Sequence, residues 1–343
     1  MENNIPKGCS NHTRKAMPKP KVYVTRKFFD EAIDLIKSVA DVEVFDGEND
    51  PIPRELLKEK ITEVDGLLPM LTDRVDGELM DLGKNLKVVS NYAVGYNNIV
   101  VPDATERGII VTNTPGVLND STADCAFMLM MAISRRLVEV DKYVREGKWV
   151  KAWGPKMLLG SDVTGKTLGI VGLGRIGQGM VPRAKGFKMN VIYHNRNPSP
   201  EKEKTLGVEY REFDDLLKEA DFVSLHVPLN DETRHLIGER ELKLMKPTAF
   251  LINTARGPVV DEKALTKALK EKWIAGAGLD VLYNEPTRHD NPLLDLDNVI
   301  VAPHIGSATT DTRLAMAMKA ATNLVAALKG EKPPDIVNPE VLE

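Results

Sequence analysis

In the stretch Lys166-Thr-Leu-Gly-Ile-Val-Gly172-Leu-Gly174-Arg-Ile-Gly177, an apolar segment runs directly into a Gly-x-Gly-x-x-Gly turn. Gly172 permits the tight turn, Gly174 lets the backbone approach a phosphate, and Gly177 lets the next helix pack on the strand. Three glycines alone could simply cap a helix. We expect a helix at 178–187 and a second strand at 189–194, and this βαβ context predicts a pyrophosphate-binding turn.

Length and charge narrow the classes of protein that this chain can belong to. With 343 residues, the chain is longer than a domain with a single hydrophobic core usually is, and its length suits two domains. The net charge of -4 shows no basic excess, which argues against nucleic acid or an anionic membrane as the main partner and favours a small-molecule substrate. No apolar run reaches the roughly 18 residues that span a bilayer.

The cysteines and the N-terminal segment bear on location. Cys9 and Cys125 are the two cysteines of the chain, so the sequence offers neither a disulfide framework nor a metal-ligand spacing, and we expect no metal site. This usage indicates a cytoplasmic protein. Residues 1–20 lack the apolar core of a signal peptide and are expected to form a disordered leader.

From Lys21 onward, short β-branched runs alternate with helical stretches. Strands are expected at 22–25, 42–45, 66–69, 87–93 and 109–112, and helices at 28–39, 54–61, 121–146 and 309–329. The alternation predicts an α/β fold with parallel sheets. The break at Thr114-Pro-Gly116 marks a domain boundary, and the last helix is expected to return to the first domain.

We therefore expect two doubly wound parallel-sheet domains with a cleft between them. The first comprises residues 21–118 together with 305–339, and the second comprises residues 119–304. Six strands of the second domain end in chemically distinctive residues, namely the glycine turn, His194-Asn195-Arg196, His226-Val-Pro228, Thr254-Ala255-Arg256, Asp280 and Pro303-His304. Because ligands bind outside the carboxyl ends of parallel strands, these exits are expected to line one crevice.

Six motifs carry a resemblance to a known family. They are Asn91-Tyr-Ala-Val-Gly-Tyr-Asn-Asn98, Val171-Gly-Leu-Gly-Arg-Ile-Gly-Gln178, Asn253-Thr-Ala-Arg-Gly257, Gly278-Leu-Asp-Val281, Asn284-Glu-Pro286 and Ala302-Pro-His-Ile-Gly-Ser307. With them the chain resembles the D-isomer-specific 2-hydroxyacid dehydrogenases, most of all the glyoxylate/hydroxypyruvate reductases, from Lys21 to Pro339. The resemblance implies a flavodoxin-like substrate domain, a Rossmann cofactor domain, a homodimer, and reduction of a small 2-oxo acid.

The resemblance also implies a catalytic trio of Arg256, Glu285 and His304. Hydride addition to a keto carbon leaves negative charge on its oxygen, which a protonated His304 can neutralise by giving up its proton. The carboxylate of Glu285, hydrogen-bonded to the far ring nitrogen of His304, would favour the charged form of that ring. The planar fork of Arg256 suits a carboxylate and a carbonyl. His226 is the rival histidine, and a wall beside the cofactor is its favoured role.

Further contacts follow from the same resemblance. The amides of Val94 and Gly95 are expected on the substrate carboxylate, and Leu71 is expected to cap the pocket. Trp153 is expected among the substrate-binding residues, in a stretch where dimeric relatives exchange contacts, with core packing as the alternative. Asp280 either lies near the nicotinamide or hydrogen-bonds in a buried position. The full set of expected cofactor contacts is Thr122, Gly172, Gly174, Arg175, Ile176, Gly177, Asn195, Arg196, Asn197, His226, Pro228, Thr254, Ala255, Asp280, His304 and Gly306.

One position departs from the pattern of NAD-specific sites. Such sites carry an acid about 20 residues past the glycine turn that accepts from the ribose 2′-hydroxyl, whereas this chain has Asn195 and Arg196. A missing carboxylate removes repulsion against a 2′-phosphate, and Arg196 offers a charged donor. NADP(H) is therefore favoured, with NAD(H) as the alternative. A D-lactate-type dehydrogenase and a dinucleotide-sensing, corepressor-like binding protein remain open.

Overall fold

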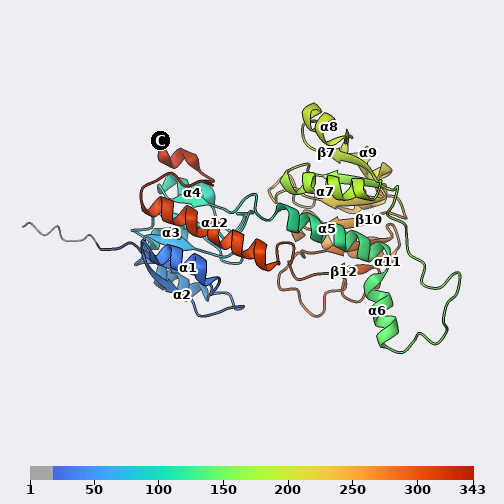
Figure 1. Cartoon of the computed structure of the whole chain (residues 1–343), viewed down its shortest axis with the longest axis horizontal. Coiled ribbons are helices and arrows are strands. Elements are labelled where there is room, and N and C mark those ends of the chain that lie inside the picture. Colours follow the sequence, from blue (N-terminus) through green and yellow to red (C-terminus); the bar gives the residue numbers. More distant parts are fainter. Residues whose placement is uncertain (1–17) are drawn as a thin grey trace, which may run out of the picture. The chain divides into compact units, whose positions relative to one another are not determined.

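The computed structural model describes residues 18–343. Cys9 and nearly all of the expected leader at 1–20 lie outside the described residues. The chain divides into two compact units (Figure 1). The first unit holds the described residues up to Tyr92 together with Ile99–Thr112 and Ala320–Glu343, and the second unit holds Ala93–Asn98 and Asn113–Lys319.

The division differs from the sequence-based expectation in three segments. The sequence assigns residues 93–98, 113–118 and 305–319 to the first domain, whereas all three belong to the second unit. Hydrogen bonds within the second unit join two of these segments, because Thr114 N donates to Ala93 O at 2.9 Å and Asn113 Nδ2 donates to Val94 O at 2.7 Å. Residues 93–98 of the glycine-containing motif at 91–98 therefore belong to the second unit.

The first unit is built on a five-stranded sheet with the order β2-β1-β3-β4-β5, in which all neighbours are parallel. Its strands are β1 (Lys21–Val24), β2 (Asp41–Val44), β3 (Gly66–Leu68), β4 (Val88–Ser90) and β5 (Ile110–Thr112). Its helices are α1 (Asp30–Lys37), α2 (Arg54–Ile61), α3 (Gly77–Leu82) and α4 (Val101–Glu106). Alternate strand residues such as Tyr23, Leu67 and Val89 join a core with α2 and α3.

The end of the chain packs on the same sheet. The C-terminal part of α12 (Thr310–Leu328) belongs to the first unit, and η2 (Pro339–Leu342) follows it. Ser90 Oγ donates to Ala320 O at 2.8 Å. Gly66 leaves room for Leu324, since an added Cβ would lie 3.0 Å from Leu324 Cδ1. Residues far apart in the sequence thus share one core, as the return of the last helix requires.

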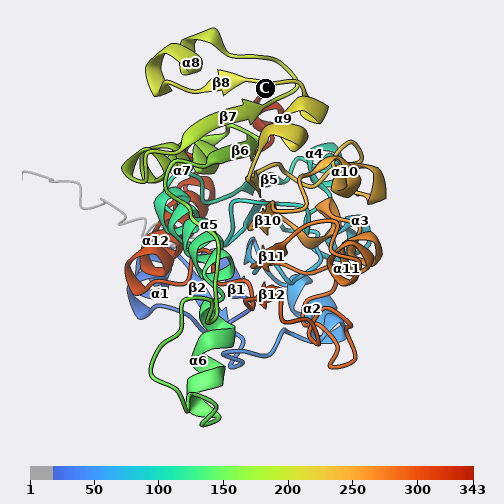
Figure 2. The same ribbon diagram turned by 90° about the vertical axis from the view of Figure 1, so that its right-hand side faces the viewer.

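The second unit contains a seven-stranded parallel sheet with the order β12-β11-β10-β9-β6-β7-β8 (Figure 2). Its strands are β6 (Thr167–Val171), β7 (Asn190–His194), β8 (Glu209–Tyr210), β9 (Phe222–Leu225), β10 (Phe250–Asn253), β11 (Gly276–Leu279) and β12 (Val299–Val301). Its helices are α5 (Asn119–Ser134), α6 (Leu137–Arg145), α7 (Arg175–Gly186), α8 (Pro200–Leu206), α9 (Phe213–Glu219), α10 (Glu239–Leu244), α11 (Glu262–Lys270) and η1 (Gly257–Val259). The predicted α/β class with two parallel sheets is confirmed, and β8 is an edge strand that the sequence did not predict.

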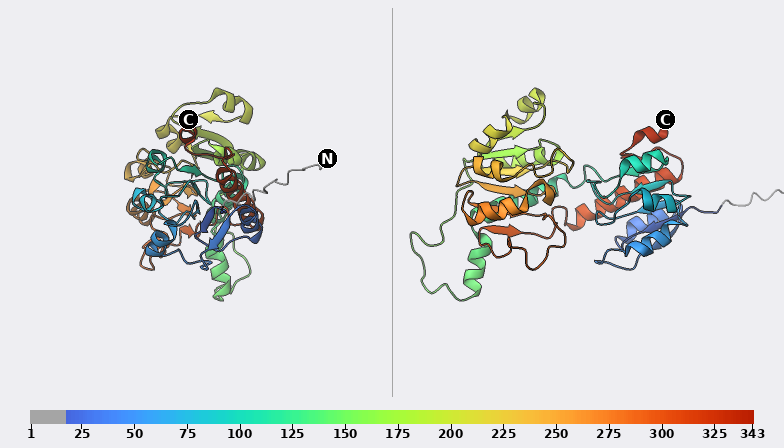
Figure 3. Two further views of the ribbon diagram at one scale, coloured as in Figure 1. Left: turned by 90° about the vertical axis from the view of Figure 1, so that its left-hand side faces the viewer. Right: turned by 180° about the vertical axis from the view of Figure 1, so that it is seen from behind.

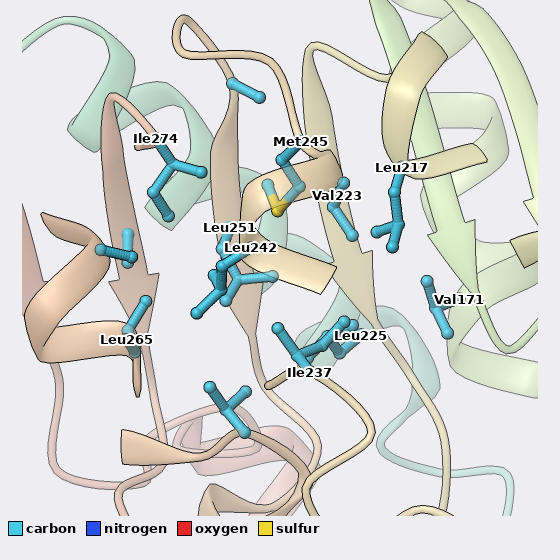
Figure 4. Packing of buried hydrophobic residues seen from close by; sticks show 14 of the residues in the cluster. Val171, Leu217, Val223, Leu225, Ile237, Leu242, Met245, Leu251, Leu265 and Ile274 are labelled. Carbon is cyan, nitrogen blue, oxygen red and sulfur yellow. The ribbon is translucent and has the colours of Figure 1, made fainter. Parts of the chain in front are cut away.

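Helices cover both faces of this sheet because its strand side chains alternate in direction. Val223 and Leu225 of β9 point to the face covered by α9, α10 and α11, where Figure 4 shows them among Leu217, Leu242 and Leu265. Their neighbour Phe222 points to the opposite face. That face is covered by α5 and α7, and buried strands of this kind hold the loops at their carboxyl ends in fixed positions.

The single helix expected at 121–146 is wrong, because the chain forms two helices, α5 and α6. Arg136 between them has φ +56°, a left-handed conformation that cannot continue a right-handed helix. Arg136 is held there by Glu139 and by Leu159 O, to which its Nη1 donates at 3.1 Å. In Figure 3 (right), α6 and the loop after it extend away from the sheet of the second unit. Among residues 18–343, no helix has the length and apolar character needed to cross a membrane.

Candidate active site

The glycine turn between β6 and α7 leaves an open space at the start of the helix. Gly172 has φ +98°, and an added Cβ there would lie 2.8 Å from the backbone of His226. An added Cβ at Gly177 would collide with Gly172 O, which explains why both positions are glycine. At Gly174, by contrast, an added Cβ would meet nothing within 4 Å. The turn therefore fits a pyrophosphate that approaches the free N–H groups at the first turn of α7.

The exit of β10 holds a buried hydroxyl that fits a bound ligand. Asn253 fixes the turn after β10, because its Oδ1 accepts from Ala255 N at 3.0 Å and its Nδ2 donates to Arg256 O at 3.0 Å. Thr254 Oγ1 is buried without a hydrogen-bond partner among the described residues. An unsatisfied buried hydroxyl is unfavourable. A dinucleotide bound at this edge could satisfy it.

The residues after β7 are arranged around the glycine turn. Asn195 Oδ1 accepts from Leu173 N at 2.7 Å, so the amide of Asn195 holds the turn in place. Arg196 is 83% exposed and pairs with Glu232 at 2.9 Å, and Asn197 is exposed. Lys202 on α8, which the sequence did not single out, donates from Nζ to Leu173 O at 3.3 Å.

His226 at the exit of β9 is poorly suited to deliver a proton. Its Nε2 hydrogen-bonds with Ser224 Oγ at 2.8 Å. Burial lowers the pKa of His226 to about 4, so the ring is neutral near pH 7. Pro228 is exposed, and its carbonyl accepts from Thr233 Oγ1 at 2.6 Å. The backbone of His226 borders the glycine turn at Gly172. The neutral, hydrogen-bonded ring of His226 agrees with a structural role there.

His304 and Glu285 form a hydrogen-bonded pair near the exit of β12. His304 Nδ1 lies 2.7 Å from Glu285 Oε2, and Glu285 Oε1 accepts from Leu282 N at 3.1 Å. The carboxylate is thus fixed from both sides. His304 Nε2 has no hydrogen-bond partner within residues 18–343. The pair therefore presents one free ring nitrogen, with the other held by a carboxylate, which is the arrangement that a general acid needs.

Asp280 at the exit of β11 holds the backbone that carries His304. His304 N donates to Asp280 O at 2.9 Å, while the carboxylate of Asp280 accepts from Ile305 N at 2.7 Å and from Gly306 N at 2.8 Å. Burial raises the pKa of Asp280, and these two backbone hydrogen bonds oppose that rise. The structure gives Asp280 the buried hydrogen-bonding role. Its expected position near a nicotinamide stays a prediction.

Close packing behind this loop involves Thr122. An added Cβ at Gly306 would lie 3.0 Å from Asp280 Oδ2 and 3.3 Å from Thr122 Cγ2. Ser121 Oγ donates to Gly306 O at 3.0 Å. The start of α5 and the exit of β11 therefore fix the loop after β12, in which His304 itself has φ +57°. This conformation is uncommon for a residue with a side chain, and such residues often occur at functional sites.

Arg256 is held by the loop at 93–98. Its Nε donates to Asn97 Oδ1 at 3.0 Å and its Nη1 donates to Ala255 O at 2.7 Å. An added Cβ at Gly95 would collide with Nη2 of Arg256, so this glycine permits the close approach. Burial lowers the pKa of Arg256, and the charge of Glu285 opposes that effect. Both acceptors are neutral, so no carboxylate in contact with the guanidinium competes with an anionic ligand.

Asn97 is the residue of this arrangement that the sequence reasoning missed. It lies 159 positions from Arg256 in the chain, and only the fold brings the two together. The available signal was its place in the motif at 91–98, two residues after Gly95. Val94 and Gly95 are half-buried in the same loop. Their expected contact with a substrate carboxylate stays a prediction.

The remaining expected residues are more scattered. Arg175 is exposed and Ile176 half-buried in the first turn of α7. Leu71 is half-buried in a turn after β3 of the first unit, and its contact with a substrate stays a prediction. Trp153 is 80% exposed, so the core-packing alternative for Trp153 is wrong. Within residues 18–343, no three His, Cys, Asp or Glu side chains gather as metal ligands would.

Comparisons with known proteins agree on one family. A model of the NAD binding domain of D-isomer specific 2-hydroxyacid dehydrogenases matches residues 127–306. A glyoxylate reductase of Thermococcus litoralis is 55% identical over 327 residues, which cover 94% of this chain and 98% of the relative.

Two solved structures extend the likeness to the whole fold. A glyoxylate reductase from Paecilomyes thermophila is 35% identical with a TM-score of 0.85, covering 94% of this chain and 100% of that one. An NADPH-dependent glyoxylate/hydroxypyruvate reductase from Sinorhizobium meliloti, solved with NADP and malonate, is 31% identical with a TM-score of 0.80, covering 93% and 97%.

Proposed function

The chain belongs to the D-isomer specific 2-hydroxyacid dehydrogenase family, and on this premise we propose that it reduces glyoxylate or hydroxypyruvate to the D-2-hydroxy acid. The family makes it an oxidoreductase that uses a nicotinamide dinucleotide. The observation that carries the proposal is the hydrogen bond between His304 and Glu285, which fixes an imidazole with one free nitrogen. Glyoxylate reductases among the relatives support this choice of substrate.

His304 is the general acid of the proposed reaction. A dihydronicotinamide dinucleotide held at the glycine turn around Gly174 would supply the hydride for the 2-carbon. Addition of that hydride would break the carbonyl π bond and leave its electron pair on oxygen. The free Nε2 of a protonated His304 donates its proton to that oxygen. Glu285 holds the proton on Nδ1, which fixes the ring orientation and stabilises the charged ring. His304 then regains a proton from solvent, and the 2-hydroxy acid leaves.

Arg256 binds the carboxylate of the substrate. Glyoxylate has no side chain, so its recognition rests on the carboxylate and on the size of the pocket. The guanidinium is held by Asn97 and the carbonyl of Ala255, both neutral acceptors. Its charge is therefore not cancelled by a protein carboxylate in contact with it, and the planar fork can engage two oxygens of the substrate.

NADPH is the proposed preferred cofactor, with NADH as the alternative. The residue after β7 is Asn195 rather than an acid, and it already holds the glycine turn through its carbonyl oxygen. A 2′-phosphate therefore meets no carboxylate from this position. The relative from Sinorhizobium meliloti that is described as NADPH-dependent supports the same choice.

A homodimer is the proposed assembly. No residue of α6 is buried, and large apolar side chains are exposed on α6 and on the loop after it, including Val138, Val144 and Trp153. Exposed apolar surface of this kind marks an interaction site. We assign this exposed apolar surface to contact with a second copy of this chain. The proposed location of the dimer is the cytoplasm. Light scattering should give the mass of a dimer for the wild type. The variant Val138→Glu/Val144→Glu should give the mass of a monomer. Lys142→Gln, on the same helix, is the control and should remain dimeric.

A reductase assay tests the proposed activity. Glyoxylate, hydroxypyruvate and pyruvate are each offered with NADPH and NADH, and an aldehyde without a carboxylate serves as the control. We expect turnover of glyoxylate and hydroxypyruvate to exceed that of pyruvate, and no turnover of the aldehyde. A cofactor deuterated at both C4 positions should give glycolate carrying one deuterium. A chain that binds the cofactor but turns over none of the acids would instead be a binding protein.

A further inference from the structure

Lys202 is a half-buried cation that the proposed reaction does not use. It lies on α8, beyond β7 (Figure 1). Its Nζ donates to Leu173 O at 3.3 Å, in the glycine turn itself. Among residues 18–343, no carboxylate lies within ion-pair distance of this ammonium group. A positive charge without a counter-ion therefore lies beside the turn.

Lys202 and Asn195 meet at the same residue of the turn. Leu173 N donates to Asn195 Oδ1 at 2.7 Å, while Leu173 O accepts from Lys202. The position of Asn195, at the end of the second strand of the dinucleotide-binding fold, is where the ribose 2′-position is read. The ammonium group of Lys202 and the side chain of Asn195 thus contact the backbone of the same residue, Leu173. Asn195 is the residue that stands in place of the usual acid.

Arg196 is less available for a phosphate than its charge suggests. It is 83% exposed and pairs with Glu232 at 2.9 Å, so an anion that binds Arg196 has to compete with a carboxylate and with water. Lys202 has no such competitor within the described residues. Of Arg196 and Lys202, Lys202 is the one whose charge is not already paired with a carboxylate.

We propose that Lys202 is the principal cation of a 2′-phosphate subsite for NADP(H), with Arg196 in a secondary role. This inference rests on the proposed preference for NADPH. The ammonium group would exchange the carbonyl of Leu173 for phosphate oxygens, or bridge the two, because it has three donors. Asn195 contributes an amide that does not repel the phosphate.

Binding of adenosine 2′,5′-bisphosphate and of 5′-AMP, measured by calorimetry, separates this role from a structural one. The two probes differ by the 2′-phosphate alone. The wild type should prefer the bisphosphate. Lys202→Gln, which keeps a donor for Leu173 O, should weaken the bisphosphate by about 10- to 100-fold, the range of a hydrogen bond to a charged group, and should leave 5′-AMP within about twofold. Lys204→Gln, an exposed position on the same helix, is the matched control and should change neither.

The outcomes distinguish this inference from the proposed function. Equal losses for both probes in Lys202→Gln would show that Lys202 only supports the turn, and a larger loss in Arg196→Gln than in Lys202→Gln would make Arg196 the principal cation. Either result overturns the inference. A wild type that does not prefer the bisphosphate overturns both the inference and the NADPH preference. A failure to reduce 2-oxo acids would refute the activity while leaving these binding results unaffected.

Discussion

Glu285 Oε2 lies 2.7 Å from His304 Nδ1, although the two residues belong to separate loops of the second unit. Leu282 N holds the other oxygen of the same carboxylate at 3.1 Å. The imidazole is therefore positioned before any substrate arrives. Preorganisation of this kind lets a general acid act without reorientation in the transition state.

Replacement of Glu285 by Gln should lower kcat/KM for glyoxylate by about 10- to 100-fold, because a hydrogen bond to a charged group is worth about 1.5–3 kcal/mol. Steady-state kinetics measure this loss. The double variant Glu285→Gln/His304→Ala should be no slower than His304→Ala alone, since Glu285 acts through His304. Independent, additive losses in the double variant would refute the pairing.

Loss of Asn97 should weaken substrate binding through Arg256. Asn97→Ala removes the acceptor for Arg256 Nε, so we expect the KM for glyoxylate to rise by about 3- to 10-fold, the effect of one ordinary hydrogen bond. Arg256→Ala should cost more, because it removes the guanidinium itself. If adding Asn97→Ala to the Arg256→Ala variant raises the KM for glyoxylate further, Asn97 has a role other than positioning Arg256.

Asn195→Asp should shift cofactor use toward NADH. The new side chain can still accept from Leu173 N, so the glycine turn is preserved while the amide nitrogen becomes a carboxylate oxygen. That oxygen repels a 2′-phosphate and accepts from a 2′-hydroxyl. The ratio of kcat/KM for NADPH to that for NADH should fall by about tenfold or more. An unchanged ratio would mean that the 2′-position is read elsewhere.

His226 should make the apo protein less stable in mild acid. Its pKa is lowered from 6.5 to about 4 by burial, so below pH 6.5 the unfolded chain binds a proton that the folded state does not bind until about pH 4. Stability is therefore full above pH 6.5 and is lost as the pH falls toward 4, by up to about 1.4 kcal/mol for each pH unit. Urea unfolding should show a shallower acid loss in His226→Gln. His289→Gln, in an exposed loop, should behave like the wild type.

Regular alternation of apolar runs was enough to predict the two parallel sheets. It located the strand exits that carry Asn195, Arg256, Asp280 and His304. The break at Arg136 could not be predicted, because no glycine or proline interrupts the sequence from 119 to 145. Only the left-handed backbone of Arg136 separates α5 from α6. Strand β8 was missed because two residues at a sheet edge leave no periodic signal.

Contacts between distant residues were beyond the reach of sequence patterns. Motifs identified Arg256 and His304 but not their supports, because the acceptor in Asn97 and the cation of Lys202 are ordinary polar residues until the fold brings them to Arg256 and Leu173. The competitor for Arg196 was missed for the same reason, since Glu232 lies 36 positions away. Residue type predicted the chemistry, whereas the tertiary structure determines which groups are free to perform it.

The most direct test of the central claim compares kcat for glyoxylate reduction in the wild type, His304→Ala and His226→Gln at saturating cofactor and substrate. We expect kcat to fall about 10²- to 10⁴-fold in His304→Ala, the usual contribution of a general acid, and to stay within tenfold of the wild type in His226→Gln. A His304→Ala enzyme that retains near-wild-type turnover, with His226→Gln inactive, would contradict it and assign the proton donor to the other histidine.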